Sequence, residues 1–127
     1  MPNPHFARIG GEEAVQRLVD AFYQRMDTLP EAAGIRRLHG ADLSEIKATL
    51  KLYLVEWLGG PKNYSAHRGP PRLRARHLAF AIGAAERDAW MSCMRGALEE
   101  VVADEALRGD LERAFLKVAN AVLNRIP

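Results

Sequence analysis

The chain has 127 residues, 48% of them hydrophobic and 27% charged, which is enough apolar material for one domain, residues 1–127, around a core or a buried cofactor. Its formal net charge is only +2, so no global field directs it to nucleic acid or to an anionic membrane. One cysteine excludes an internal disulfide, and the longest uncharged apolar run, residues 78–85, is far too short to span a membrane.

These features favour a soluble protein in a reducing, cytoplasmic setting. No charged-then-apolar leader precedes Phe6, which points to the same compartment. The basic character of the chain is local, because four arginines lie within residues 68–76. We expect no nucleic-acid or membrane partner, and either a monomer or a homodimer.

The first long helix is predicted over residues 12–28. A short turn at residues 4–9 ends at two glycines, and apolar side chains then repeat at helical spacing. Tyr23 lies on the same side of this helix as Phe22. From spacing alone, Tyr23 is a core tyrosine with its hydroxyl near the surface.

A second long helix is predicted to end at Trp57. Before it, Pro30 opens a short helix that ends near residues 38–40. Asp42 and Glu45 have the spacing of a capping box. An apolar stripe follows, and the helix stops at a Gly-Gly-Pro sequence. The stripe consists of Ile46, Leu50, Tyr53, Leu54 and Trp57.

Residues 62–74 read as a loop rich in proline, glycine and arginine. Pro70 and Pro71 forbid an ordinary helix there, so we expect an ordered loop that leads into a very short helix over residues 76–80. A loop of this length is functional or disordered, and its position before His77 favours function.

Two further long helices follow. Apolar stripes predict one over residues 85–102 and another whose apolar line runs from Leu107 to Val122, with Asp104 as its N-cap. No stretch alternates with the period of a strand. The predicted fold class is all-α, with one helix pair in residues 12–57 and another in residues 85–125.

His77 is the strongest candidate for cofactor binding. It is the only histidine with an arginine cluster on one side and an apolar stretch, which includes Phe80, on the other. A flat, apolar, dianionic cofactor such as haem needs this combination: imidazole for the metal, hydrocarbon for the rings and arginine for the carboxylates. The alternative is a core histidine beside a solvated basic loop.

Several segments in a fixed order then favour the cofactor-binding interpretation of His77 over a core histidine. They are Phe22-Tyr23, Trp57-Leu-Gly-Gly-Pro61, Tyr64, Arg72-Leu-Arg-Ala-Arg-His-Leu-Ala-Phe80 and Glu86-Arg-Asp-Ala-Trp-Met-Ser-Cys-Met94. With this order and spacing, the chain from about Phe6 to Val122 resembles the group II truncated haemoglobins. The resemblance implies the shortened globin fold, a two-over-two helical sandwich around haem b.

The resemblance also implies residue roles around the haem. His77 matches the proximal iron ligand, whose second ring nitrogen is expected to donate to a backbone carbonyl. Arg76 and Tyr64 match positions near the propionates. Further cofactor contacts are expected from Leu73, Phe80, Tyr53 and Lys51.

On the distal side the matching residues are Tyr23, His39, Ile46, Leu50 and Trp90. Ile46 occupies the position where many globins have a distal histidine, so Tyr23 and Trp90 must supply the polarity. Each good donor to oxygen is worth roughly 1.5–3 kcal/mol. His39 is expected to point inward and to present a proton-bearing nitrogen.

Three departures limit the resemblance. Gly69-Pro70-Pro71 replaces a Gly-His-Pro sequence that relatives often have, so any role of that histidine is lost. Thr49 lies where relatives have a basic residue, for which Lys51 or Lys62 could compensate. Cys93 reads as a buried, inert thiol, and a redox role is the weaker alternative.

The resemblance implies a haem protein with high oxygen affinity, suited to redox chemistry with oxygen, nitric oxide or peroxide. Tight binding argues against bulk oxygen transport. An enzyme such as a nitric oxide dioxygenase or a peroxidase would need a separate reductase, because no flavin or nicotinamide motif is present. The alternatives are a gas-binding or sensing module without turnover, with carbon monoxide as a further ligand, and a haem-free helical interaction protein.

Overall fold

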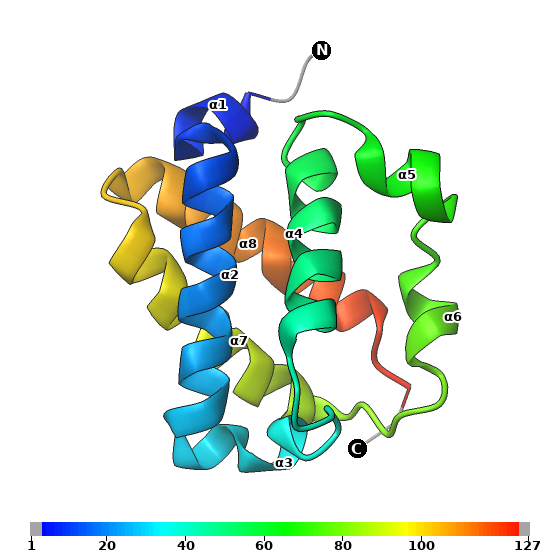
Figure 1. The fold of residues 1–127 in the computed structure, drawn as a ribbon. Coiled ribbons are helices and arrows are strands. Elements are labelled where there is room, and N and C mark those ends of the chain that lie inside the picture. The colour runs from blue at the N-terminus through cyan, green and yellow to red at the C-terminus, as the bar shows by residue number, and fades with distance from the viewer. Residues whose placement is uncertain (1–3, 125–127) are drawn as a thin grey trace.

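The computed structural model describes residues 4–124, and every regular element in that range is helical (Figure 1). In chain order the elements are α1 (His5–Ile9), α2 (Gly11–Thr28), the 3-10 helix η1 (Pro30–Ala32), α3 (Ala33–Arg36), α4 (Ser44–Trp57), α5 (Asn63–Arg68), α6 (Leu73–His77), α7 (Ala84–Val101) and α8 (Glu105–Ala121). The prediction of an all-α fold is confirmed. None of the described helices is long and apolar enough to cross a membrane.

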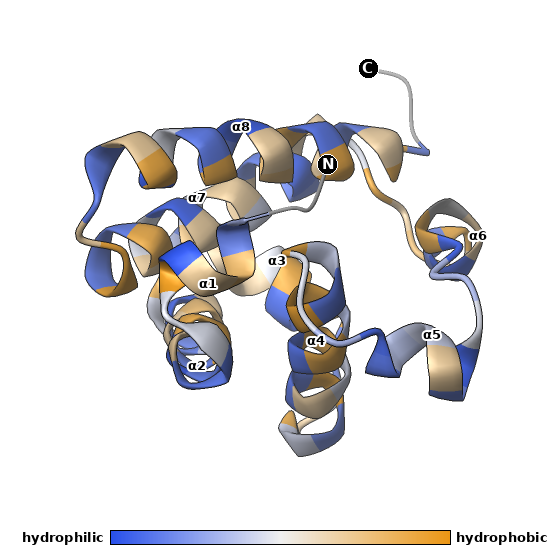
Figure 2. Ribbon diagram, turned by 90° about the horizontal axis from the view of Figure 1, so that it is seen from above, coloured by the Kyte–Doolittle hydropathy of each residue, from blue (hydrophilic) through white to orange (hydrophobic). Residues whose placement is uncertain are grey.

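The four long helices form two layers. α2 packs on α4, α7 packs on α8, and α2 and α7 join the layers. Seen from above, α7 and α8 run along one side, and α2 and α4 are viewed nearly end-on at the other (Figure 2). This is the two-over-two sandwich that the resemblance implies.

The core lies where α2 meets α7. Phe22 of α2 and Met94 and Leu98 of α7 are almost completely buried, and each such side chain contributes about 1.5–3 kcal/mol by its burial. The ring of Phe22 lies 4.9 Å from that of Tyr23 and 5.1 Å from that of Trp90, measured between centroids. The core therefore also fixes two residues that the sequence assigns to the distal side.

The start of α4 differs from the sequence prediction. Asp42 accepts hydrogen bonds from the backbone and hydroxyl of Ser44, at 2.9 and 2.6 Å, and these bonds hold the pKa of Asp42 below its usual value. The N-cap position is Leu43, whose side chain makes no capping bond. The predicted capping box is therefore wrong: an Asp-Ser turn precedes the helix, which begins at Ser44, one residue later than an N-cap at Asp42 would place it.

The turn that follows α4 requires a glycine at position 60, the second glycine of the Gly-Gly-Pro sequence. The Gly60 N–H donates to the Val55 carbonyl at 2.8 Å, so the chain folds back tightly over the last turn. A Cβ on Gly60 would lie 2.8 Å from that carbonyl oxygen and 3.0 Å from Phe6 Cδ1. The backbone of Phe6 is itself held by a bond to Leu58 O at 2.8 Å, which anchors α1 to this turn.

We expect Gly60→Ala to lower the free energy of unfolding by about 1–3 kcal/mol, the usual cost of forcing an extra methyl group into a packed site. Thermal unfolding followed by circular dichroism measures this loss. Gly34→Ala is the control, because the nearest atom to its new Cβ is Arg37 Nη2 at 4.0 Å. Equal melting temperatures for Gly60→Ala and the wild type would contradict the steric argument.

The prediction that residues 62–74 form an irregular loop is wrong, because α5 and the start of α6 lie there. The Glu56 carboxylate accepts a bond from Ser65 N at 2.9 Å and another from the Ser65 hydroxyl, which satisfies an N–H of the first turn of α5. These bonds lower the pKa of Glu56. Their stabilisation is therefore present above about pH 4.5 and is lost as the pH falls through the lowered pKa.

The helix that carries His77 also lies earlier than predicted. We expected it over residues 76–80, but α6 ends at His77. Beyond it, Leu78 N bonds to Ala75 O at 3.3 Å and Phe80 N to His77 O at 3.0 Å, which are turn bonds rather than helical ones. Pro70 and Pro71 lie before α6, so they do not prevent the helix from starting at Leu73. After His77, hydrogen bonds from Asn124 to the carbonyls of His77 and Phe80 replace the helical bonds.

Two other local predictions are supported. Asp104 is the N-cap of α8 and accepts bonds from Ala106 N at 2.9 Å and Leu107 N at 3.2 Å. Pro30 opens η1 as expected, and the helical segment then ends at Arg36, before the predicted end. A turn bond from His39 N to Arg36 O, at 3.1 Å, continues the curve toward residue 40.

Candidate cofactor and ligand site

A cavity of about 620 Å³ opens among α4, α6, α7 and α8. It lies within the range of about 300–1,000 Å³ typical of cofactor and small-molecule sites. α5 and α6 stand apart from the long helices on this side of α4 (Figures 1 and 2). Apolar and aromatic side chains form most of the wall: Tyr23, Ile35, Leu38, Ile46, Leu50, Tyr53, Leu54, Trp57, Tyr64, Leu73, Phe80, Ile82, Trp90, Phe115, Val118, Ala119 and Val122.

His77 reaches this cavity from the last residue of α6. Its Nδ1 lies 2.6 Å from the carbonyl oxygen of Leu73. A carbonyl only accepts, so in the neutral ring Nδ1 carries the proton and Nε2 keeps a free lone pair. This is the backbone contact expected of a metal-binding imidazole.

A metal at His77 would need ligands from outside the protein. Among residues 4–124, no three His, Cys, Asp or Glu side chains lie close enough together to bind a metal ion. One imidazole beside an apolar cavity therefore suits a metal that arrives with its own ring of ligands, as in haem.

Tyr23 and Trp90 reach the cavity from α2 and α7. The helices that carry Tyr23 and His77, α2 and α6, lie on opposite sides of α4 in Figure 1. Phe22 packs against both rings, and Phe115 lies 5.8 Å from Trp90 between centroids. Packing from the core thus leaves neither ring free to turn away.

The polar groups of these two rings are unpaired donors. Within the described chain, neither the Tyr23 hydroxyl nor the Trp90 indole N–H has a hydrogen-bond partner. Neither polar atom is completely buried. Burial raises the pKa of Tyr23 to about 12, so its hydroxyl stays protonated at neutral pH. Two unpaired donors therefore belong to residues of the cavity wall, the O–H of Tyr23 and the N–H of Trp90.

His39 lines the cavity beside Tyr23, with ring centroids 5.9 Å apart in an edge-on arrangement. Its Nδ1 lies 2.9 Å from the Ile35 carbonyl oxygen, so this nitrogen donates to the backbone. In the neutral ring Nε2 is then an acceptor. This differs from our expectation of a proton-bearing nitrogen toward Tyr23, because the backbone of α3 takes the proton-bearing side.

Ile46 and Leu50 both line the cavity, on successive turns of α4. Ile46 is 38% exposed, whereas Leu50 packs against the core. Neither side chain can donate a hydrogen bond. The face of the cavity formed by α4 is therefore apolar at these two positions.

Most of the residues predicted to contact the cofactor also line this cavity: Leu73, Arg76 and Phe80 around α6, Tyr64 on α5 and Tyr53 on α4. The ring of Tyr64 packs edge-on against Tyr53 at 5.8 Å. Arg76 Nε donates to the Pro71 carbonyl at 2.8 Å, which orients the guanidinium and leaves its two terminal nitrogens for an anion. Arg68 brings a second guanidinium to the wall.

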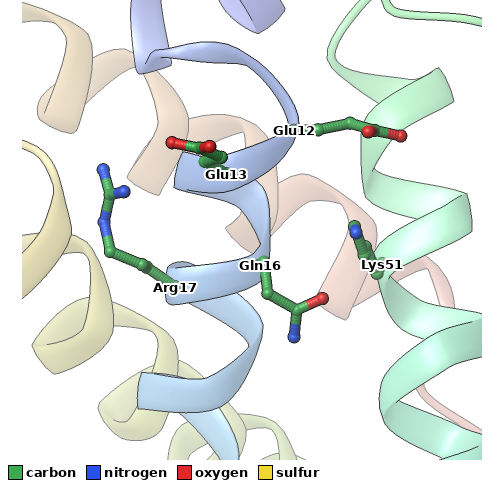
Figure 3. Close-up of a pocket in the computed structure, with 5 residues that line it drawn as sticks. All are labelled: Glu12, Glu13, Gln16, Arg17 and Lys51. Atoms are coloured by element: carbon green, nitrogen blue, oxygen red, sulfur yellow. The ribbon is translucent and has the colours of Figure 1, made fainter.

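Lys51 does not line this cavity. It lies in a separate, shallow depression between α4 and α2, with Glu12, Glu13, Gln16 and Arg17 (Figure 3). In that view Lys51 leans from α4 toward the side of α2 that carries Gln16. The helical rotation of about 100° per residue explains the difference, since Leu50 faces the cavity and Lys51 therefore faces α2.

Cys93 lies in the core and is fully buried. Burial raises the pKa of its thiol to about 11, so the thiolate is scarce at neutral pH. This supports the expectation of an inert thiol.

Sequence reasoning missed several wall residues. Phe115, Val118 and Val122 were read only as a core stripe of α8, because a helix face toward a cavity has the same spacing as one toward a core. Arg87 was missed as well. It lines the cavity while donating to Asp88 at 3.0 Å and to Asn120 at 3.1 Å. Its position three residues before Trp90 was the available signal.

Comparisons with known proteins agree over almost the whole chain. A family model described as bacterial-like globin matches residues 5–124. The group 2 truncated haemoglobin of Bacillus subtilis is 41% identical over 106 residues, which cover 84% of this chain and 74% of that protein. The cold-adapted truncated haemoglobin of the Antarctic marine bacterium Pseudoalteromonas haloplanktis has a TM-score of 0.93 at 33% identity, covering 95% and 98% of the two chains. The group II 2-on-2 haemoglobin of the plant pathogen Agrobacterium tumefaciens has a TM-score of 0.92 at 41% identity, covering 95% and 94%.

Proposed function

This chain belongs to the bacterial-like globin family, within the group II truncated haemoglobins, and from that premise we propose that it holds haem b and binds oxygen tightly for redox chemistry. Globins hold haem and bind small gaseous ligands, so the general function follows from the family. The observation that carries the finer proposal is the pair of unpaired donors, Tyr23 and Trp90, in the cavity that His77 also lines.

The residues present fit haem. His77 has a free Nε2, the walls are apolar, and Arg68 and Arg76 provide cations for two propionates. The single Cys93 is buried, and the chain has no Cys-x-x-Cys-His motif, which favours noncovalent haem b over covalently attached haem. Bound haem supplies an iron atom that takes up a diatomic gas and shifts electron density onto oxygen.

Tyr23 and Trp90 would donate hydrogen bonds to the ligand that carries this negative charge. Each donor stabilises a negatively polarised ligand by roughly 1.5–3 kcal/mol, and together they slow its release by a factor on the order of a hundred or more. Slow release is unsuited to bulk oxygen transport. It suits a reaction in which a second molecule meets the retained oxygen.

Dioxygenation of nitric oxide is the reaction we favour, with peroxide reduction as a related activity. One nitric oxide, one oxygen molecule and one external electron give one nitrate, so the reaction needs an electron donor. We propose a separate cytoplasmic reductase as that partner, since the sequence contains no flavin or nicotinamide motif.

Absorption spectra of the purified protein test the haem assignment. The oxidised, reduced and carbon monoxide-bound forms should each show a Soret band, and a protein that takes up no haem would contradict the proposal. Stopped-flow turnover with nitric oxide and a chemical reductant or reductase then tests catalysis. Retained oxygen without turnover would favour a gas-binding or sensing module instead.

We expect His39→Phe to change the ferric spectrum and the oxygen release rate without loss of haem. The substitution removes the imidazole ring that donates through Nδ1 to the Ile35 carbonyl and packs edge-on against Tyr23. Absorption spectra and stopped-flow traces measure both quantities.

Phenylalanine keeps the aromatic contact with Tyr23, so the comparison isolates the imidazole. We would abandon the distal role of His39 if the variant reproduced both the wild-type ferric spectrum and the wild-type oxygen release rate.

A further inference from the structure

Asn124, just beyond the end of α8, binds the segment that follows α6. Its amide Nδ2 donates to the carbonyls of His77 at 3.1 Å and Phe80 at 2.8 Å. Its Oδ1 accepts from Ile82 N at 2.9 Å, and its own backbone N–H donates to Ile82 O at 2.9 Å. Four hydrogen bonds therefore join the end of the last helix to residues 77–82.

Both polar ends of this side chain are used, and their orientation is unambiguous. Two carbonyl oxygens face the nitrogen and one N–H faces the oxygen, so only one placement of the amide satisfies all three groups. An aspartate in the same place would set a carboxylate oxygen against two carbonyls. A leucine of similar size would remove the partner of the Phe80 carbonyl and of the Ile82 N–H, and would leave the His77 carbonyl with only its turn bond from Phe80 N.

α6 needs such support, because it has only five residues and packs sparsely against the other described helices. Helices this short do not persist on their own. The residues after it are partly open to solvent, with Leu78 59% and Phe80 38% exposed. The hydrogen bonds from Asn124 therefore carry much of the constraint on the backbone at His77.

We propose that Asn124 is a positioning residue for the proximal histidine. By fixing the His77 carbonyl and the turn after it, Asn124 sets how far and at what angle His77 Nε2 enters the cavity. The bond from His77 Nδ1 to Leu73 sets the rotation of the ring, and the bonds from Asn124 set the position of the backbone beneath it. This inference rests on the proposed function, because it concerns the imidazole that we assign to the iron.

The test uses haem-loaded Asn124→Leu and Asn124→Asp, with Asn120→Ala as the control. Asn120 lies one turn earlier on α8 and bonds Arg87 rather than residues 77–82. Resonance Raman of the ferrous protein measures the iron–histidine stretching band. We expect a shifted or broadened band and haem loss roughly ten-fold faster or more in both Asn124 variants, and neither change in Asn120→Ala.

A second comparison separates positioning from general stability. In His77→Gly supplied with imidazole, the ligand is no longer attached to the backbone. Adding Asn124→Leu to that variant should then leave the iron–imidazole band unchanged. A further shift in the double variant would overturn the proposal.

Different results would contradict the proposed function and the positioning role of Asn124. A wild-type protein without a haem spectrum would contradict the proposed function. A normal wild-type spectrum, with an unchanged iron–histidine band in both Asn124 variants, would overturn only the positioning role. If the variants bind too little haem for Raman, amide exchange of the haem-free proteins decides the question: faster exchange at Ile82 than in Asn120→Ala supports the role, and equal exchange overturns it.

Discussion

His77→Gly should abolish the histidine-ligated ferrous spectrum and accelerate haem loss by roughly a hundred-fold or more, since each 1.4 kcal/mol of lost binding is a factor of ten. The structure motivates this because the His77 imidazole faces the cavity with its Nδ1 proton donated to Leu73. Absorption spectra and haem transfer to an acceptor protein measure the two effects. Added imidazole should restore much of the spectrum, because the cavity left by the side chain admits the free ring.

His5→Ala and His67→Ala are the controls. His5 is on α1 and His67 is exposed on α5, and neither lines the cavity. Both variants should keep the wild-type spectrum. If His77→Gly retained a five-coordinate, histidine-ligated ferrous form without added imidazole, the assignment of the proximal ligand would be wrong.

Tyr23→Phe and Trp90→Phe should each speed oxygen release by roughly ten-fold or more, as expected for the loss of one charge-assisted hydrogen bond. The double variant should release oxygen faster than either single variant. Stopped-flow dissociation from the ferrous protein measures these rates. Phenylalanine keeps an aromatic ring against Phe22 at both positions, so the core should change little.

Carbon monoxide provides the internal control, because it is far less polar when bound and should respond less to either substitution. The contribution of Tyr23 should also be constant through neutral and mildly alkaline pH. Its pKa is raised to about 12, so the donor is lost only as the pH approaches that value. Unchanged oxygen release in both single variants would show that the two donors do not reach the ligand.

The periodic parts of the chain were predictable because their signals are local. Apolar stripes located α2, α7 and α8 to within a few residues, and the cap at Asp104 depends on groups two and three residues away. The choice of His77 as the candidate imidazole also came from its neighbours in the sequence. Such features depend on contacts within one helix, and the spacing of residues in the sequence determines those contacts directly.

Two of the corrections depend on a segment that is not adjacent in the sequence. α5 was missed because the carboxylate at its first turn belongs to Glu56, nine residues before Ser65. Lys51 was placed at the cofactor by resemblance, but the rotation of α4 about its axis turns it toward α2. Neither outcome can be read from the residues next to these positions.

By itself, the sequence determined the all-α class, the long helices and the residue types that haem would need. Only the tertiary structure decided which of them meet at one cavity, that Tyr23 and Trp90 present unpaired donors there, and that His39 presents an acceptor. Asn124 shows the reason most clearly, because it bonds His77 across 47 positions of the chain. Helical spacing reports which residues share a face, whereas hydrogen bonds between distant segments depend on how the faces are packed together.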